Sequence, residues 1–416
     1  MNGNLSPPPP NAHEPSVVFG ELTAAYRGLT LRSVFQPIAS VVLGGVVGYE
    51  VLLRATNRSG HPVSTPMVFD EAAEVDELEI LNRIVCELHL KNFRNRDPEH
   101  CLLFINISTG VFCQLVEETV SLIELAAEFG ISTGRIAIEI LENDFLDDDN
   151  FSRCVIKCKE AGFMVALDDF GKGLSNFDRV LNFAPSVVKY DMSLVSKARS
   201  NAKLRRAYYH LTAMLHEVGT MVLAEGIESV EDALLMVDAG VDFLQGYWIA
   251  RPAAAIGIDA VSAKIRELKE LYAIKADDRE KEDRNDRGAL RETMLRAAER
   301  YAEAGDIAGA AGIFLALPSS KRFYVLDENG FDVAVGEAPN NVIDLRATAK
   351  VGPFRATKHS SMIHRDYFRE AIRRPNEVHF HSPVFSFLDG ATFDIVVKAV
   401  SRDGRRFVVC GLYLRQ

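Results

Sequence analysis

The stretch FMVALDDFGKG at residues 163–173 joins a short apolar segment to two adjacent carboxylates and a glycine-containing turn. The strand candidate, residues 163–169, begins with the Val- and Leu-rich composition of a strand buried on both faces. In barrels built from parallel strands, active-site residues follow the carboxyl ends of the strands. The stretch therefore predicts a buried strand that ends at a polar site.

Seven further segments of this kind occur between residues 33 and 247, and helical stretches separate most of them. Only a Gly-Gly turn separates the first two, which predicts a hairpin between them. Eight strands in about 240 residues predict an α/β fold, namely a TIM-type (β/α)8 barrel with one antiparallel strand. The seven segments are SVFQPI (33–38), VVGYEVLLR (46–54), CLLFINIS (101–108), RIAIEI (135–140), SVVKYD (186–191), MVLAEGI (221–227) and DFLQGY (242–247).

Length and charge limit the classes of protein and partner. A chain of 416 residues predicts two or three domains. The net charge of −11 argues against long nucleic acids and anionic membranes as partners, because both need a basic face, but it allows a small anionic ligand. The chain shows no signal peptide or membrane-spanning run, and its six cysteines are scattered, so we expect a soluble, cytoplasmic protein.

The chain divides into four predicted parts. Residues 1–16, with their run of four prolines, predict a disordered leader, and residues 17–258 contain the barrel. Residues 259–305 predict a charged helical spacer, whose middle, ADDREKEDRNDRG (276–288), is either a solvated helix face or a loose linker. Residues 306–416 predict a small α+β domain of strand, helix and strand meander.

A polar or charged group follows every predicted strand from the second to the eighth. Carboxylates around one cavity repel each other, and bound divalent cations are the simplest way to neutralise this repulsion. Oxygen ligands without histidine or cysteine favour Mg²⁺ or Mn²⁺, and a shared aspartate would suit two ions that act on an oxyanion. Any single acidic residue in this place is more often a helix cap or a turn former. The groups are Glu50, Asn106, Glu139 with Glu142, Asp168 with Asp169, Lys189 with Asp191, Glu225 with Glu228, and Gln245.

Motifs along the first 60% of the chain resemble those of one known family, in the same order. Residues 50–54, EVLLR, have the E-x-L-x-R form of the EAL signature, which alone is a weak signal. The other motifs are QPI (36–38), FINIS (104–108), EILEN (139–143), DDFGKG (168–173), VKYD (188–191), AEGIES (224–229) and LQGYWIARP (244–252). Together they resemble the EAL-domain cyclic di-GMP phosphodiesterases. This resemblance implies metal-dependent hydrolysis of cyclic di-GMP to linear pGpG with Mg²⁺ or Mn²⁺, and two ions.

The resemblance also implies roles for individual residues. Lys189 would orient or activate the attacking water, and Arg54 would grip a phosphate. Glu142 would brace the loop after Asp169. The implied metal ligands are Glu50, Asn106, Glu139, Asp168, Asp169 and Glu225; the catalytic residues are Lys189, Glu225 and Glu228; and the substrate-binding residues are Gln36, Leu52, Arg54, Gln245 and Arg251.

Four positions depart from the family pattern without removing an implied metal ligand. Lys172 and Leu174 stand where the family usually has threonine and tyrosine, and Thr109 and Leu141 replace a proline and a threonine. In this family the loop after the paired aspartates couples dimerisation to catalysis, so the changes bear on rate more than on binding. Lys172 could also pair with the acidic cluster.

The C-terminal part resembles a PAS- or Cache-like fold, in the place of an EAL-associated signalling domain. Tyr367 and Arg369 could belong to a ligand pocket there, although a core aromatic and a solvated charge are the favoured interpretations. We expect a homodimer regulated through this domain, with an unnamed ligand. The alternative function is a catalytically weak or inactive receptor that binds cyclic di-GMP and signals through the C-terminal domain. Because the chain keeps every acidic ligand, we favour the enzyme.

Overall fold

The fold consists of two compact units, Met1–Ile274 and Lys275–Gln416, each with its own core. The leader predicted at residues 1–16 lies outside the described residues. Among the described helices, none has the length and apolar character needed to cross a membrane. The computed structural model describes residues 17–18, 22–94, 101–107, 119–141, 148–172, 180–181, 184–333, 361–386 and 391–414.

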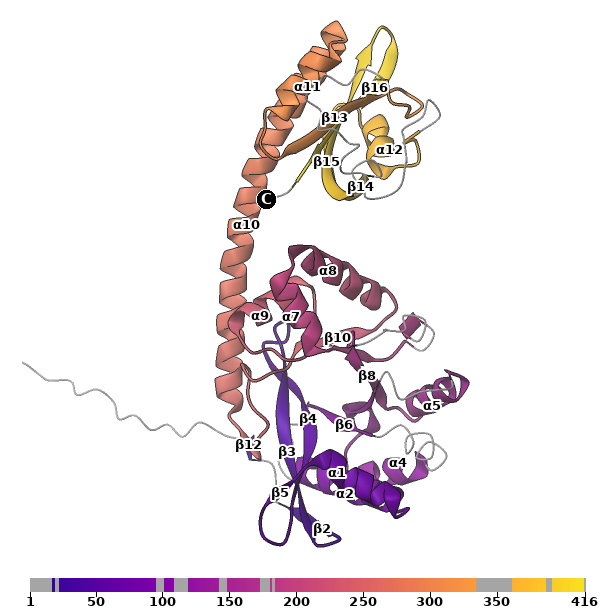
Figure 1. The fold of residues 1–416 in the computed structure, drawn as a ribbon, viewed down its shortest axis with the longest axis vertical. Helices are drawn as coiled ribbons and strands as arrows, with labels where there is room; N and C mark the ends of the chain where they lie inside the picture. The colour runs from indigo at the N-terminus through magenta and orange to yellow at the C-terminus, as the bar shows by residue number, and fades with distance from the viewer. Residues whose placement is uncertain are drawn as a thin grey trace, which may run out of the picture. The chain divides into compact units, whose positions relative to one another are not determined.

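Eight strands of the first unit close into a ring, in the order β3-β11-β10-β9-β8-β7-β6-β4 and back to β3 (Figure 1). Strand β3 runs antiparallel to both of its neighbours, and the other neighbours are parallel. The prediction of a TIM-type barrel with one antiparallel strand is therefore confirmed. The bounds are β3 Leu29–Ser40, β4 Gly45–Thr56, β6 Leu102–Asn106, β7 Ile136–Leu141, β8 Met164–Phe170, β9 Val187–Tyr190, β10 Met221–Ala224 and β11 Phe243–Leu244.

Strands β3 and β4 form the predicted hairpin, with Gly44 at φ +80° in its turn. Their register sets Gln36 opposite Glu50. Both strands extend beyond the ring and pair there with short strands that the sequence did not reveal. These are β2 (Thr23–Tyr26) on β3 and β5 (Pro62–Val63) on β4. A further short pair joins β1 (Val17–Val18) to β12 (Ala255–Ile256).

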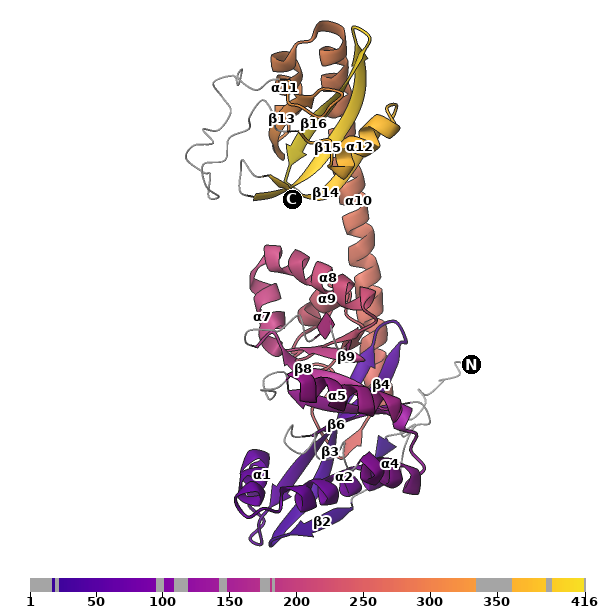
Figure 2. The same ribbon diagram turned by 90° about the vertical axis from the view of Figure 1, so that its right-hand side faces the viewer.

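Helices cover the outside of the ring, as both ribbon views show (Figures 1 and 2). The apolar residues on the outer faces of the strands pack against these helices in one large core. A smaller cluster fills the inside of the barrel and includes Phe104, Ala137, Ala166, Val187 and Leu223. The helices are α1 Thr65–Glu74, α2 Leu78–Arg94, α4 Thr119–Glu128, α5 Asp148–Glu160, α7 Met192–Ser200, α8 Ala202–Glu217 and α9 Val230–Asp238, with the 3-10 turn η1 Thr133–Arg135.

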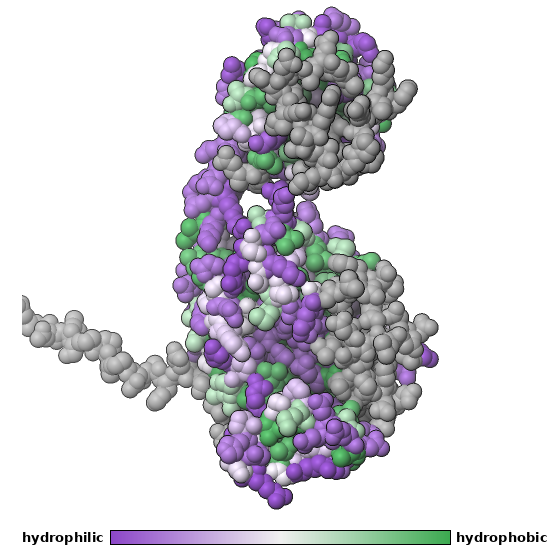
Figure 3. Space-filling view, in the orientation of Figure 1, coloured by the Kyte–Doolittle hydropathy of each residue, from purple (hydrophilic) through white to green (hydrophobic). Residues whose placement is uncertain are grey.

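Helix α10 runs without interruption from Ile258 to Ala304. Of the two interpretations of residues 276–288, the solvated helix is the one the structure has, and Figure 3 shows this stretch as a hydrophilic surface. The boundary between the two compact units falls inside this helix, after Ile274.

The second unit is an antiparallel sheet with helices on both faces. The strands β13 (Ser320–Leu326), β14 (Val378–Ser386), β15 (Ala391–Arg402) and β16 (Arg405–Tyr413) lie in the order β13-β16-β15-β14. Helices α10 and α11 (Ile307–Leu315) pack on one face, and α12 (Asp366–Arg373) packs on the other. The Phe314 ring lies so close to Gly411 that a Cβ at that glycine would come within 2.2 Å of it.

The second unit contains both helices and strands, and the α+β, PAS- or Cache-like domain at residues 306–416 stays a prediction. Tyr367 is buried in the core beneath α12, where its hydroxyl hydrogen-bonds with that of Tyr324. Arg369 pairs on the helix surface with Asp366. The structure therefore agrees with the favoured interpretations, in which Tyr367 is a core aromatic residue and Arg369 is a surface charge.

Candidate active site

The predicted site residues converge because side chains alternate along each strand. Residues i and i+2 of a strand face the same side, so the position two residues after an apolar residue of the barrel interior also points inward. Phe104, Ala137, Ala166, Val187, Leu223 and Phe243 are such interior residues. The residues two positions further along are Asn106, Glu139, Asp168, Lys189, Glu225 and Gln245.

Glu50 differs from these residues because it lies in the middle of β4 and not at a strand end. Strand β4 pairs with β6 only through residues 48–51 and then continues beyond the ring along β3. The carboxyl end of the part of β4 that belongs to the barrel is therefore close to Glu50. This places its carboxylate at the same edge as the other site residues.

Lys189 is the centre of the cluster. Its side chain has no exposed surface. Its Nζ lies 2.7 Å from Glu139 Oε1, 2.8 Å from Glu225 Oε1, 3.2 Å from Asp168 Oδ1 and 3.8 Å from Glu50 Oε2. Four carboxylates, three on β4, β7 and β8 and one directly after β10, thus surround one ammonium group, and the cluster carries an excess of negative charge.

Two amides hold the Glu50 carboxylate in place. Asn106 Nδ2 donates to Oε1 at 2.9 Å, and Gln245 Nε2 donates to Oε2 at 2.6 Å. The same Gln245 nitrogen lies 3.3 Å from Oε1 of Gln36, whose own Nε2 donates to the carbonyl of Ala250 at 3.4 Å. The network joins strands that are distant in the sequence and fixes the rotamer of Glu50.

The pKa values reflect this concentration of charge. Burial acts to raise the pKa of Glu50, but Lys189 and the amides of Gln245 and Asn106 outweigh it and lower the value. Burial and the neighbouring Glu50 raise the pKa of Glu139 well above its ordinary value. Burial raises the pKa of Glu225 to about 7, against the attraction of Lys189. The pKa of Lys189 is well above its ordinary value, because the surrounding carboxylates outweigh the effect of burial.

The oxygen atoms of the cluster fit divalent cations. Asp168, Asp169 and Glu225 each offer one carboxylate oxygen, and these three atoms lie within 4.8 Å of one another. Two buried oxygens, Oε2 of Glu139 and Oε1 of Gln245, have no hydrogen-bond donor among the described residues. Buried oxygens without donors are costly unless a cation satisfies them. Carboxylate and amide oxygens are ligands that Mg²⁺ and Mn²⁺ prefer.

The stretch after Asp168 adopts a strained turn. Asp169 has φ +57°, a conformation that few residues other than glycine adopt. Its backbone N–H donates to Oδ1 of Asp168 at 2.9 Å, and the N–H of Lys172 donates to the carbonyl of Asp169 at 3.1 Å. The Lys172 ammonium pairs with Asp169 Oδ2, as the sequence suggested that it could.

Other predicted site residues form no hydrogen bond or ion pair with the described residues of the cluster. Arg54 is exposed and donates to the carbonyl of Leu53 at 2.8 Å, and Leu52 is partly buried on the same strand. Glu228 is exposed in the turn after β10, with its backbone N–H 3.3 Å from Asp232 Oδ2. Glu142, Leu174 and Thr109 lie outside the described residues, as does the side-chain environment of Leu141.

Two further observations come from the structure alone. Asp191, one of the strand-end carboxylates, is the N-cap of α7 and accepts a hydrogen bond from the Ser193 N–H at 2.9 Å. The exposed Arg251 lies over the ring of Tyr247, with its guanidinium carbon 4.1 Å from the ring centroid. Sequence reasoning missed Tyr247, although the LQGYWIARP motif contains it.

The fold and site together define an α/β barrel with an acidic, oxygen-rich site at the carboxyl ends of its strands. A family model described as the EAL domain matches residues 20–252, which is more than half of the chain. The chain therefore belongs to the EAL-domain family.

Curated relatives match the barrel. The chain is 27% identical over 223 residues to the uncharacterized EAL-domain containing protein YkuI of Bacillus subtilis, covering 52% of this chain and 54% of that protein. It is also 27% identical over 236 residues to the cyclic di-GMP phosphodiesterase RocR of Pseudomonas aeruginosa, covering 54% and 59%. The chain thus spans little more than half the length of these two relatives.

Solved structures show the same fold. The YkuI protein of Bacillus subtilis, in complex with cyclic di-GMP and calcium, has a TM-score of 0.75 at 21% identity, covering 93% of this chain and 97% of that one. A manganese and cyclic di-GMP complex of BlrP1 from Klebsiella pneumoniae has a TM-score of 0.51 at 20% identity, covering 57% and 59%. At these identities the likeness is one of fold.

Proposed function

We propose that the chain hydrolyses cyclic di-GMP to linear pGpG with two Mg²⁺ or Mn²⁺ ions. The observation that carries this proposal is the convergence of four carboxylates on the buried Lys189 at the mouth of the barrel. A phosphodiester is anionic and needs cations to enter such a cluster. Relatives named as cyclic di-GMP phosphodiesterases support the choice of substrate.

The chain offers two sets of ligands. Glu50, Asn106, Glu139 and Asp168 would hold one ion, and Asp168, Asp169 and Glu225 would hold the other. The three carboxylate oxygens within 4.8 Å of one another support the second set. When bound, such ions lower the pKa of water and stabilise the charge of a phosphoryl transition state.

The other residues of the cluster would position the reactants. Because Lys189 keeps its proton, it would orient the attacking water by donating a hydrogen bond rather than by accepting a proton. The proton acceptor would then be a carboxylate, Glu225 or Glu228. Gln36 and Gln245, fixed around Glu50, would face the substrate. Arg54, Leu52 and Arg251 would complete the substrate site, with Arg54 on a phosphate.

The proposal also includes regulation of the barrel by the loop after Asp169 and by the C-terminal domain. Glu142 would brace the loop after Asp169, and this loop would link activity to a homodimer contact. Residues 306–416, after the spacer at residues 259–305, would act as a PAS- or Cache-like regulatory domain with its own ligand. The similarity in fold to YkuI covers 93% of this chain. It supports the same order of barrel and C-terminal domain along the two chains.

One observation favours a second candidate function, that of a weakly active receptor for cyclic di-GMP. The Lys172 ammonium already pairs with Asp169, one of the proposed ligands of the second ion. A lysine in this place competes with the ion for the same carboxylate. If the competition is strong, the barrel would bind cyclic di-GMP without cutting it efficiently.

One assay separates the two functions. The purified full chain is incubated with cyclic di-GMP and Mn²⁺, pGpG is quantified by chromatography, and binding of cyclic di-GMP is measured separately. The enzyme predicts steady formation of pGpG, which Glu50→Ala abolishes while Glu71→Ala, at an exposed carboxylate on α1, does not. Tight binding without any pGpG would reject the enzyme and favour the receptor. Unchanged turnover in Glu50→Ala would reject the proposed metal ligands.

A further inference from the structure

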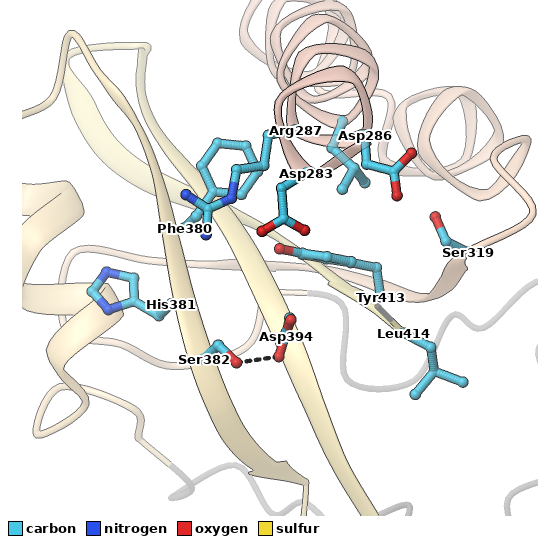
Figure 4. Close-up of a pocket in the computed structure, with 11 residues that line it drawn as sticks. Asp283, Asp286, Arg287, Ser319, Phe380, His381, Ser382, Asp394, Tyr413 and Leu414 are labelled. Atoms are coloured by element: carbon cyan, nitrogen blue, oxygen red, sulfur yellow. Dashed lines mark hydrogen bonds between the residues drawn. The ribbon is translucent and has the colours of Figure 1, made fainter. Parts of the chain in front are cut away.

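The second unit contains a cavity of about 230 Å³ between α10 and one face of its sheet (Figure 4). The cavity shares no residue with the acidic cluster of the barrel. Its walls carry both charged and aromatic side chains. Asp283, Asp286 and Arg287 line it from the helix, and Phe380, Asp394 and Tyr413 line it from three neighbouring strands.

Asp394 is the unusual member of this set. It is only 3% exposed, and its register partner on β16 is Tyr413. The Ser382 hydroxyl donates to its Oδ1, and Figure 4 shows both side chains on the cavity side of the sheet. Within the described parts of the chain, no Lys, Arg or His nitrogen lies within 4.0 Å of its carboxylate. Because buried carboxylates are almost always paired, Asp394 requires a cation from outside these residues.

Arg287, the arginine among the described residues that line the cavity, does not meet this need. The Arg287 guanidinium lies over the Phe380 ring, 5.5 Å from its centroid. Asp283 and Asp286 stand beside it on the same helix. Among the described residues of the wall, Asp286 and the buried Asp394 outnumber this guanidinium, and the excess of negative charge attracts a positively charged ligand.

The spacing of the carboxylates argues against a metal ion. Among the described residues, only the barrel group has three ligand atoms within 4.8 Å of one another. The three carboxylates of the C-terminal cavity therefore do not form such a group, whereas an organic cation can extend from one to another. The ring of Tyr413 also suits an organic cation, which gains from contact with a ring face, whereas the Phe380 ring already lies against Arg287 and Arg291.

Size and protonation narrow the ligand further. A cavity of about 150 Å³ holds one benzene molecule, so 230 Å³ accommodates a ligand of a few more heavy atoms. Burial and the nearby Asp394 raise the pKa of Tyr413 to about 12, against the effect of Arg287. The Tyr413 hydroxyl is therefore neutral at physiological pH and can hydrogen-bond with a ligand.

We propose that this cavity binds a small organic cation with a primary ammonium group, and that Asp394 is its counter-ion. Ser382 holds one oxygen of the carboxylate, which leaves the other for the ammonium group. Asp286 on α10 supplies further attraction at the helix side.

Isothermal titration of the full chain at constant ionic strength tests this proposal. The probes are n-propylammonium and 1,4-diaminobutane, with 1-propanol and 1,4-butanediol as neutral counterparts. Saturating MgCl₂ is present throughout, so that the metal sites proposed for the barrel are filled and Mg²⁺ competes for the cavity. We expect both amines to bind under these conditions and the alcohols not to bind. Equal binding of the alcohols, or no binding of either amine at millimolar concentration, would overturn the proposal.

Variants test whether the amines bind at Asp394. We expect Asp394→Asn to weaken amine binding by at least about tenfold, because a charged hydrogen bond is lost. Asp366→Asn, which removes an exposed carboxylate on α12, should leave the affinity unchanged. If Asp394→Asn does not fold, Asp286→Asn on the exposed side of α10 replaces it, with an expected loss of about threefold. Unchanged affinity in a folded Asp394→Asn, or in Asp286→Asn where it stands in, would contradict the proposal.

Discussion

The Nζ atom of Lys172 lies 2.8 Å from Oδ2 of Asp169. This contact joins one of the four residues that depart from the family pattern to a carboxylate proposed to hold the second metal ion. The lysine side chain is 59% exposed, whereas the aspartate side chain is 25% exposed. An exposed pair of this kind is worth about 0.2–1 kcal/mol, so it can tune metal binding without preventing it.

Replacement of this lysine should strengthen metal binding. In Lys172→Thr, Asp169 is free of its internal cation, and we expect Mn²⁺ affinity to rise by up to about fivefold. Isothermal titration of the full chain with Mn²⁺ measures this change independently of catalysis. Lys197→Thr, at an exposed lysine on α7, is the control that should not alter the affinity. An unchanged or weaker affinity in Lys172→Thr would show that the contact does not compete with the ion.

Removal of the central lysine should destabilise the metal-free protein. In Lys189→Met, four carboxylates lose the cation that they surround. We expect the free energy of unfolding in EDTA to fall by about 3 kcal/mol, the order of effect seen when one partner of a buried ion pair is removed. Added Mn²⁺ should stabilise this variant more than it stabilises the wild type, because the ions then supply the missing positive charge.

Chemical denaturation with and without Mn²⁺ measures both effects. Lys203→Met, at an exposed position of α8, is the matched control and should lose little stability. If Lys189→Met were as stable as the wild type in EDTA, the carboxylates would not depend on this ammonium group.

The stability of the barrel should depend on pH through a buried histidine. Burial lowers the pKa of His89 from its ordinary 6.5 to about 3, and its Nδ1 lies 2.8 Å from the Ser33 hydroxyl. Between these pKa values the unfolded state binds a proton that the folded state does not. The contribution of His89 to the free energy of unfolding is therefore fully present above pH 6.5. It falls as the pH drops, by about 1.4 kcal/mol for each pH unit below 6.5.

Comparison with a variant isolates this contribution from the acidic cluster. We expect His89→Gln to show a shallower loss of unfolding free energy than the wild type between pH 6.5 and 4.5, about 2–3 kcal/mol less over this range. His210→Gln, at an exposed histidine, should follow the wild type. Parallel curves for wild type and His89→Gln would show that His89 is not neutral in the folded state.

The barrel strands could be predicted from the sequence because most are buried on both faces. In β9, for example, Val187, Val188 and Tyr190 are apolar or aromatic and buried, so the lysine between them was already conspicuous. The short strands β1, β2, β5 and β12 carry too few residues to give a periodic pattern. β2 and β5 pair with the parts of β3 and β4 that extend beyond the ring, and β1 pairs with β12, which follows the last barrel strand. These pairings depend on the folded barrel and not on a local sequence pattern.

The candidate site was predictable as a set of inward-facing positions but not as a network. Strand ends predicted that Glu139, Asp168 and Glu225 would meet, yet Asp191 has the same pattern and is a helix cap. The cavity at Asp394 left no signal in the sequence. It arises only where three strands and a helix come together, so no local motif could mark it.

The most direct test of the central claim is the metal dependence of cyclic di-GMP hydrolysis by the full chain. The protein is stripped with EDTA, the chelator is removed, and pGpG formation is followed by chromatography as Mn²⁺ is added. We predict no pGpG without metal and restoration of hydrolysis as the acidic cluster fills. Hydrolysis at full rate in the stripped protein, or none at saturating Mn²⁺ although cyclic di-GMP binds, would contradict the account.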